Sequence, residues 1–259
     1  MLTEPRIIAI IPARWSSTRF PGKPLANIAG IPMIQRVVQQ TQKAKCIKEV
    51  IVATDDSRIF DVVRQNGGTA IMTSAEHQSG TDRIAEVARQ CDCDIVVNVQ
   101  GDEPLIPPQN IEKVVKPLIK DSLISVTSLR TLIKKPKDLD NQNITKVVVD
   151  KFDSALYFSK APIPWDRDNW PVNLEEVSNL SIPVWFKHIG LYAYRKQFLM
   201  EYSTLPTSPL ENIEKLEQLR ILENGFSIKV LETDMDSMGV DSETDIELIE
   251  QQLALSPEN

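Results

Sequence analysis

Cysteine and histidine are scarce in this chain. Its 259 residues include only three cysteines and two histidines. The odd number of cysteines (Cys46, Cys91 and Cys93) argues against a disulfide framework and indicates reduced thiols, as in cytoplasmic proteins. So few histidines also argue against a histidine-rich zinc site. We therefore expect a cytoplasmic protein whose fold does not depend on disulfides.

Long apolar runs are also missing. The apolar segments are a few residues long, so we expect no helix that spans a bilayer. The N-terminal segment MLTEPRIIAI has an early glutamate and proline and is unlike a signal peptide. A formal net charge of −7 and a pI of about 5.1 argue against general nucleic-acid binding. These absences predict a globular protein that binds neither membranes nor nucleic acid.

Two kinds of segment alternate in the first half of the chain. Residues 7–13, 49–55 and 94–100 are short, nearly continuous β-branched runs, which are typical of strands buried on both faces. Apolar residues at helical spacing lie between and after them, at 33–38, 59–63, 84–88 and 111–118. This alternation predicts a Rossmann-like α/β fold, in which helices cover both faces of a mostly parallel sheet.

The second half has strand-like runs without full helices between them, at 123–132, 145–150, 154–159 and 188–194. They predict a mixed-sheet lobe inserted into the α/β core. Two helices, 208–225 and 242–255, close the chain, the first with Ser208 and Glu211 in a capping box. We therefore predict one domain over 1–259. Its parts are a core at 1–130, a lobe at 131–240 and a C-terminal helix at 241–259 that returns to the core.

The two glycine-rich phosphate motifs are absent. Pro24 follows Gly22-Lys23, which rules out a Walker A loop, and no Gly-x-Gly-x-x-Gly sequence occurs. Nevertheless, the segment RWSSTRFPGK (14–23) places three cations directly after the first predicted strand. Ligands of open α/β sheets bind beyond the carboxyl ends of the strands. The segment therefore predicts a site for a small anion such as phosphate, the alternative being a solvated basic loop.

The next two predicted strands also end in polar residues, Asp55-Asp56 and QGDEP (100–104). Asp102 could bind Mg²⁺, which takes one or two carboxylates together with phosphate oxygens; the alternative is a turn aspartate. Asp241 offers a second carboxylate or simply caps the following helix. In HQSGTDR (77–83), the helix start at Ser79 could bind an anion or a base carbonyl, or be a plain cap.

Several segments in one order along the chain together resemble the 3-deoxy-manno-octulosonate cytidylyltransferase (CMP-Kdo synthetase) family. These are IPARWSSTRFPGKPL, HQSGTDR, VNVQGDEPLI, ALYFSKAPIPWDRD, KHIGLYAYR, SPLENIEKLEQLRILENG and GVDSETD, spanning about residues 5–252. The resemblance implies a nucleotidyltransferase-type fold. It also implies a reaction of CTP with Kdo, a 2-keto-3-deoxy sugar acid, that gives CMP-Kdo and pyrophosphate with Mg²⁺, for lipopolysaccharide biosynthesis.

The resemblance also implies roles for individual residues. The triphosphate would be held by Arg14, Ser17, Arg19 and Lys23, the cytosine by Ser79 and Gly80, and the metal by Asp102 and Asp241. Gln100 and Asp102 would lie at the reaction centre, with Arg14, Lys23 and Asp102 as the catalytic residues. The sugar acid would contact Gln100, Arg167, His188, Tyr192 and Glu211. Lys160 and Lys187 depart from the family, where arginine is commoner.

Three alternatives remain open on the sequence. The enzyme could act on the 8-amino analogue of Kdo or on another sugar acid, or the chain could be a non-catalytic nucleotide-binding module. The presence of both Asp102 and Asp241 argues against the last, because binding alone does not require a metal pair. We also expect a homodimer, since apolar side chains gather in the predicted lobe. These are Trp165, Trp170, Trp185 and Phe186.

Overall fold

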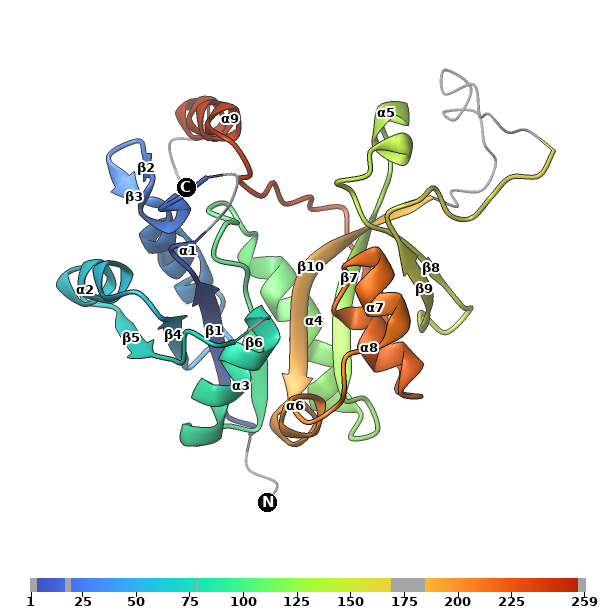
Figure 1. Ribbon diagram of the computed structural model, residues 1–259, viewed down its shortest axis with the longest axis horizontal. Helices are drawn as coiled ribbons and strands as arrows, with labels where there is room; N and C mark the ends of the chain where they lie inside the picture. Colours follow the sequence, from blue (N-terminus) through green and yellow to red (C-terminus); the bar gives the residue numbers. More distant parts are fainter. Residues whose placement is uncertain (1–3, 17–19, 78, 169–184, 256–259) are drawn as a thin grey trace.

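The computed structural model describes residues 4–16, 20–77, 79–168 and 185–255 (Figure 1). Predictions about Ser17, Arg19 and Trp170 lie outside these ranges. The elements of the first half are β1 (Ile7–Ala13), η1 (Lys23–Leu25), β2 (Asn27–Ile28), β3 (Ile31–Pro32), α1 (Met33–Gln42), β4 (Glu49–Thr54), α2 (Ser57–Gln65), β5 (Thr69–Met72), α3 (Gly80–Gln90), β6 (Ile95–Asn98) and α4 (Pro108–Lys120). Those of the second half are β7 (Val126–Leu132), α5 (Pro136–Asp140), β8 (Lys146–Val149), β9 (Ala155–Ser159), β10 (Phe186–Arg195), α6 (Lys196–Tyr202), α7 (Pro209–Glu214), α8 (Gln218–Glu223), β11 (Lys229–Glu232) and α9 (Glu243–Leu255).

One large sheet organises the described residues, with strand order β11-β7-β10-β6-β1-β4-β5. The pairs β1–β4, β1–β6, β4–β5 and β7–β11 are parallel, whereas β10 runs antiparallel to both β6 and β7. Strands β8 and β9 branch from the start of β10. The predicted α/β fold with a mostly parallel sheet is therefore confirmed, and β10 supplies its antiparallel element.

Helices cover both faces of the sheet, as predicted. One apolar cluster joins the sheet to α1, α2 and α4, and a second joins its other face to α3, α6 and α8. In Figure 1, α3, α6, α7 and α8 lie in front of the strands, and α1 and α4 lie behind them. Every residue of β1 except Pro12 is buried, as its unbroken β-branched sequence predicts for a central strand.

The second half of the chain contributes to this central sheet instead of standing apart from it. Strand β7 crosses the boundary predicted at residue 130, and β10 and β11 pair with β6 and β7 inside the sheet. Of the segment predicted as a lobe, the hairpin β8–β9 and helix α5 project from the sheet (Figure 1). The division of the chain at 130 and 240 stays a prediction.

The helix predicted over 208–225 is divided in two. Helix α7 ends at Lys215, whose backbone is left-handed with φ 57°, and α8 begins at Gln218. The last helix, α9, returns to the β2–β3 hairpin and α1, where Ile249 and Val240 pack with Ile28 and Met33. No helix in the described ranges is long and apolar enough to cross a membrane.

Candidate active site

The loops that follow β1 and β6 meet at one edge of the sheet and form a first cavity, which we call the β1 cavity. Its volume is about 390 Å³, and it is lined by Pro12, Ala13, Arg14, Ser16, Lys23, Pro24, Gln100, Gly101, Asp102 and Asp241. Because β1 and β6 are parallel neighbours, their carboxyl ends lie side by side. The structure thus brings Arg14, Lys23, Gln100, Asp102 and Asp241 together as the sequence predicts.

Two glycines allow these loops to approach each other. A Cβ on Gly101 would lie 2.7 Å from the carbonyl oxygen of Pro12, so only glycine lets the loop after β6 pass so close to β1. Gly22 has φ +73°, a left-handed conformation that favours glycine, and its amide donates to Trp15 O at 3.1 Å. The turn at Gly22 directs Lys23 back over the end of the strand.

Lys23 lies between the two aspartates. Its Nζ is 2.6 Å from Asp102 Oδ2, 3.7 Å from Asp241 Oδ1, and donates to Val240 O at 2.7 Å. The Lys23 side chain is only 14% exposed, whereas those of Asp102 and Asp241 are 36% and 53% exposed. Two carboxylates and one ammonium therefore face the same small volume, although they come from three distant parts of the chain.

Asp245 makes hydrogen bonds at the start of α9. Asp245 Oδ2 accepts from the amides of Asp241 and Ser242 at 2.9 and 2.8 Å. The carboxylate of Asp241 instead lies beside Lys23. Asp241 therefore lies where it could serve as a ligand, and the choice between this role and a helix cap stays a prediction.

Arg14 presents a buried donor to the β1 cavity. Its Nη2 atom has no hydrogen-bond partner among the described residues. Burial and the neighbouring guanidinium of Arg83 lower the pKa of Arg14. Arg83 is itself fully buried and donates to Asp55 Oδ2 at 2.6 Å. A partly buried guanidinium with one N–H group that has no partner among the described residues is suited to an anion such as phosphate.

Asp56 and Ser79 are helix caps. Asp56 caps α2 by accepting from the amide of Arg58 at 2.9 Å, and Ser79 caps α3 by accepting from the amide of Asp82 at 3.0 Å. Ser79 does not line the β1 cavity. The proposed contacts of Ser79 and Gly80 with a base stay predictions.

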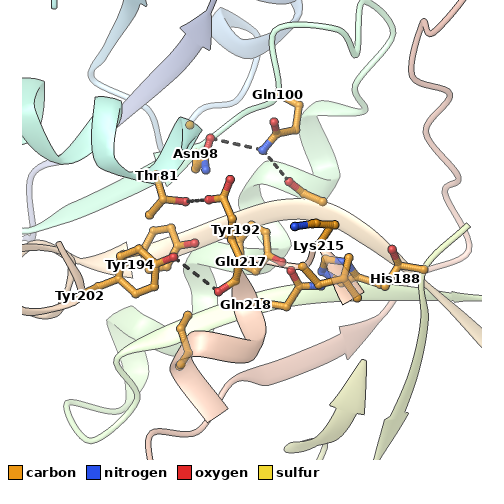
Figure 2. Close-up of a pocket in the computed structure, with 15 residues that line it drawn as sticks. Thr81, Asn98, Gln100, His188, Tyr192, Tyr194, Tyr202, Lys215, Glu217 and Gln218 are labelled. Carbon is orange, nitrogen blue, oxygen red and sulfur yellow. Dashed lines mark hydrogen bonds between the residues drawn. The ribbon is translucent and has the colours of Figure 1, made fainter. Parts of the chain in front are cut away.

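A second cavity of about 260 Å³ lies over β10, and we call it the β10 cavity (Figure 2). It is lined by Gly80, Thr81, Asn98, Gln100, Thr145, His188, Gly190, Tyr192, Tyr194, Tyr202, Lys215, Leu216, Glu217, Gln218 and Ile221. Residues 188, 190, 192 and 194 alternate along β10 and therefore share one face of the strand. His188 and Tyr192, predicted to face the sugar acid, both lie here.

Burial shifts the pKa values of several side chains in the β10 cavity, among them His188 and Tyr192. Burial and the charge of Lys160 lower the pKa of His188 to about 3, so its ring is neutral at physiological pH. His188 Nε2 lies 2.8 Å from Ser128 Oγ, which orients the ring. Burial also raises the pKa of Tyr192 well above its ordinary value. The floor of this cavity is thus uncharged.

Glu217 and Gln218 line this cavity although the sequence analysis did not select them. Glu217 Oε2 accepts from Thr81 Oγ1 at 2.7 Å, which links α3 to the α7–α8 junction, and burial raises the pKa of Glu217. Figure 2 shows Glu217 in the middle of the cavity below Gln100, with Lys215 on the side of His188. The left-handed backbone of Lys215 interrupts the helix, and Glu217 and Gln218 after the interruption line the cavity. The sequence predicts a continuous helix here, so it reveals neither the interruption nor the place of Glu217 and Gln218 in the cavity.

Glu211, predicted to contact the sugar acid, lines neither cavity. Its two carboxylate oxygens accept from Arg220 at 2.6 and 2.8 Å, and one also accepts from the amide of Ser208 at 3.2 Å. Both side chains of the pair are more than nine-tenths buried. The carboxylate of Glu211 therefore joins α7 to α8, and its contact with the sugar acid stays a prediction.

Three other predicted positions lie outside the two cavities. Arg167 is exposed in the loop after β9, and its role stays a prediction. Lys160 donates to Asn143 O at 3.0 Å. Lys187 lies on the face of β10 opposite His188 and pairs with Asp236 at 2.6 Å. The two lysines that depart from the resemblance thus have structural partners.

Gln100 lines both cavities. Its Nε2 donates to Gly190 O at 3.1 Å, and this bond connects the loop after β6 to β10. A cavity with aspartate and lysine charges and a cavity lined mainly by tyrosine, histidine and amide side chains therefore adjoin at a single amide side chain. Such an arrangement suits the transfer of a group from a polyanion to a polar acceptor.

The class of the protein follows from its fold and its relatives. The family described as cytidylyltransferase matches residues 8–232. A solved structure of CMP:2-keto-3-deoxy-manno-octonic acid synthetase, complexed with CTP, has a TM-score of 0.87 and 39% identity, covering 96% of this chain and 99% of that one. The 4-diphosphocytidyl-2C-methyl-D-erythritol synthase of Anaerococcus prevotii shares the fold at a TM-score of 0.61 and 14% identity, covering 97% of this chain and 99% of that one. The chain is a nucleotidyltransferase of the cytidylyltransferase class.

Sequence relatives narrow the class further. The 3-deoxy-manno-octulosonate cytidylyltransferase of Geobacter metallireducens is 50% identical over 249 residues, which cover 96% of this chain and 98% of that protein. The enzyme of the same name from Syntrophotalea carbinolica is 53% identical over 247 residues, covering 95% and 98%. This chain belongs to the 3-deoxy-manno-octulosonate cytidylyltransferase family, so the resemblance seen in its motifs is confirmed.

Proposed function

We propose that this chain transfers CMP from CTP to the anomeric hydroxyl of Kdo and releases pyrophosphate. The observation that carries the proposal is the place of Gln100 between the two cavities. The β1 cavity offers cations for a triphosphate, and the β10 cavity offers neutral hydrogen-bonding groups for a sugar. The name shared by relatives at about 50% identity supports Kdo as the acceptor.

The triphosphate would lie in the β1 cavity. Arg14 offers a fork of N–H donors there, including the buried Nη2, and Lys23 offers a point charge. Charge-assisted hydrogen bonds from these groups become stronger as charge develops on the departing pyrophosphate. Arg14 and Lys23 would thus bind the nucleotide and stabilise its leaving group.

Mg²⁺ is part of the proposal, with Asp102 and Asp241 as its protein ligands. The pair fits a hard cation of this kind, because both carboxylates face the point occupied by Lys23 Nζ and leave room for phosphate oxygens. No larger cluster of potential metal ligands occurs in the part of the chain that the structure describes. When bound there, Mg²⁺ would lower the pKa of the sugar hydroxyl and neutralise phosphate charge.

The sugar acid would lie in the β10 cavity, where His188, Tyr192, Glu217 and Gln218 can hydrogen-bond its hydroxyl groups. With the sugar on one side of Gln100 and the triphosphate on the other, the anomeric oxygen would attack the α-phosphorus. Pyrophosphate would then leave on the opposite side, into the β1 cavity. Arg167, with a guanidinium that matches a carboxylate, would bind the acid group from its exposed loop.

We further propose that the protein is a homodimer. Of the aromatic residues that suggested it, Trp165 is 61% exposed, whereas Trp185 is buried and donates from Nε1 to Pro164 O at 2.9 Å. The edge strand β9 adds Leu156, which is 62% exposed. Apolar side chains on an open strand edge favour association with a second copy. Sedimentation at micromolar concentration tests this, and a monomer would contradict it.

The main experiment measures pyrophosphate release with CTP, Mg²⁺ and a panel of acceptors. The panel contains Kdo, its 8-amino analogue, a sialic acid and a control without sugar. We expect release with Kdo and none without an acceptor. Faster turnover with another acid would reassign the substrate. No release with any acid, despite CTP binding, would leave a nucleotide-binding module.

A further inference from the structure

Asp241 reaches the β1 cavity at the end of a segment that has no regular secondary structure. We call residues 233–241, between β11 and α9, the returning segment. It runs across the top of the sheet in Figure 1. Its first residue is fixed by Thr233 Oγ1, which donates to Asn110 Oδ1 at 2.8 Å. Its last residue, Asp241, lies near Asp102. Between these ends, the side chains of Glu103 and Lys187 bind the segment.

The first of these contacts is made by Glu103, the residue after Asp102. Its carboxyl is buried, and its Oε2 accepts from Ser237 Oγ at 2.7 Å. Glu103 lines neither cavity. A carboxyl in this position ties the returning segment to the loop that carries Asp102. A backbone hydrogen bond also joins the returning segment to this loop, since the amide of Val240 donates to Asp102 O at 2.9 Å.

The second contact is an ion pair made by Lys187 on β10. Its Nζ lies 2.6 Å from Asp236 Oδ2, and the Lys187 side chain is 19% exposed. Lys187 points away from the β10 cavity, because its neighbours His188 and Phe186 alternate with it along the strand. The ion pair therefore connects Asp236, the residue before Ser237, to the central sheet.

A positional restraint is needed here for an electrostatic reason. Asp102 and Asp241 carry like charges and converge on one point, so the free segment would favour a larger separation. Lys23 offsets this repulsion, yet its Nζ also faces the phosphate region. A second, ligand-independent restraint would keep the aspartates close when Lys23 turns to a phosphate.

We propose that Glu103 and Lys187 are positioning residues. By holding Ser237 and Asp236 of the returning segment, they set the separation of Asp241 from Asp102 and so the affinity of the site for Mg²⁺. Neither residue lines the β1 cavity or the β10 cavity. This inference rests on the proposed function, since it needs Asp102 and Asp241 to be the metal ligands.

The test compares Ser237→Ala with the wild type in two measurements. The first is the Mg²⁺ concentration that gives half-maximal pyrophosphate release. The second is calorimetry of CTP binding with and without Mg²⁺ in the absence of sugar, which needs no turnover. Loss of a group that orients a metal ligand costs about 10- to 100-fold in metal affinity. We expect about tenfold more Mg²⁺ at half-maximal rate and a smaller gain in CTP affinity from Mg²⁺, with metal-free CTP affinity unchanged.

Three further variants sharpen the result. Ser237→Thr keeps the hydroxyl and should restore wild-type Mg²⁺ dependence. Lys187→Met should raise the half-maximal Mg²⁺ concentration by only about threefold, because a partly exposed ion pair contributes little. Thr233→Val is the matched control, since it removes a buried hydroxyl at the far end of the same segment. It should lower the melting temperature without changing the Mg²⁺ dependence.

Asp241→Asn separates failure of this inference from failure of the metal assignment. If Asp241→Asn removes the gain in CTP affinity from Mg²⁺ and Ser237→Ala does not, the positioning role is overturned and the metal pair stands. An equal effect of Thr233→Val would also overturn it, because general loosening would then explain the data. If Asp241→Asn leaves the gain intact, both the metal pair and the positioning role fail.

Discussion

The two cavities that adjoin at Gln100 are built in different ways. The β1 cavity uses loops at the carboxyl ends of neighbouring parallel strands, where the fold itself gathers polar residues. The β10 cavity uses one face of an antiparallel strand and the interrupted junction between α7 and α8. The first site follows from topology, whereas the second depends on a local break in a helix.

The cavities also differ in electrostatics. Lys23, Asp102 and Asp241 in the β1 cavity are charged groups that face one another at the surface. In the β10 cavity, burial lowers the pKa of His188 and raises the pKa of Glu217, so desolvation disfavours charge. One cavity would therefore recognise its ligand by charge and the other by shape and neutral hydrogen bonds. Substitutions should separate these two modes.

The largest effect is expected for Asp102→Asn. The substitution keeps the size of the side chain but removes the charge that a hard cation needs. Loss of charge stabilisation at a phosphoryl centre costs on the order of 10²- to 10³-fold in kcat. Product formation at saturating Mg²⁺ would measure it, beside a thermal melt that should remain close to wild type. Near-full activity in the folded variant would remove Asp102 from the reaction centre.

Arg14→Ala should lower kcat/KM for CTP by about 10- to 100-fold, because a hydrogen bond to a charged group contributes roughly 1.5–3 kcal/mol. KM for the sugar acid should change little, since Arg14 lines only the β1 cavity. The matched control is Arg64→Ala on the exposed surface of α2. Steady-state kinetics with varied CTP decides, and equal values for both variants would contradict a phosphate role.

Glu217→Gln and Glu211→Gln form a reciprocal pair. Glu217→Gln should raise KM for the sugar acid about tenfold and leave KM for CTP within about twofold, because it changes a hydrogen-bonding group in the β10 cavity. Glu211→Gln should leave both KM values near wild type but lower the melting temperature by about 10 °C, since it breaks a buried ion pair with Arg220. The opposite pattern would restore Glu211 to the sugar site.

A further prediction concerns pH and His188. Its pKa is about 3 in the folded protein and about 6.5 in an unfolded chain, so below pH 6.5 only the unfolded state gains the proton. The contribution of His188 to the free energy of unfolding should therefore fall as the pH drops from 6.5 towards 3. Denaturant unfolding at pH 7, 5 and 4 should show a smaller fall for His188→Gln. Parallel curves for both proteins would contradict a neutral, buried imidazole.

The fold and the β1 cavity could be predicted because each depends on patterns that are local in sequence. Nearly continuous β-branched runs mark β1, β4 and β6, and polar residues mark their carboxyl ends. Topology then requires those ends to meet. The sequence therefore predicts Lys23 and Asp102 as site residues from their places after two of these strands.

The rest of the site depends on a backbone choice that composition does not reveal. Nothing in the segment IEKLEQ identifies Lys215 as the residue that adopts a left-handed conformation, because glycine or asparagine would be the usual choice there. The sequence favours a capping-box role for Glu211 over a ligand contact but does not exclude the contact, because both kinds of glutamate have the same local pattern. Only the ion pair with Arg220 separates the two roles.

The place of Gln100 between the two cavities has a stereochemical consequence. If the acceptor oxygen approaches the α-phosphorus from one side of that amide and the leaving group departs on the other, the displacement is single and in line. The configuration at phosphorus must then invert. CTP made chiral at the α-phosphorus with sulfur should give a CMP-sugar of inverted configuration, whereas two successive displacements through a covalent enzyme intermediate would retain it.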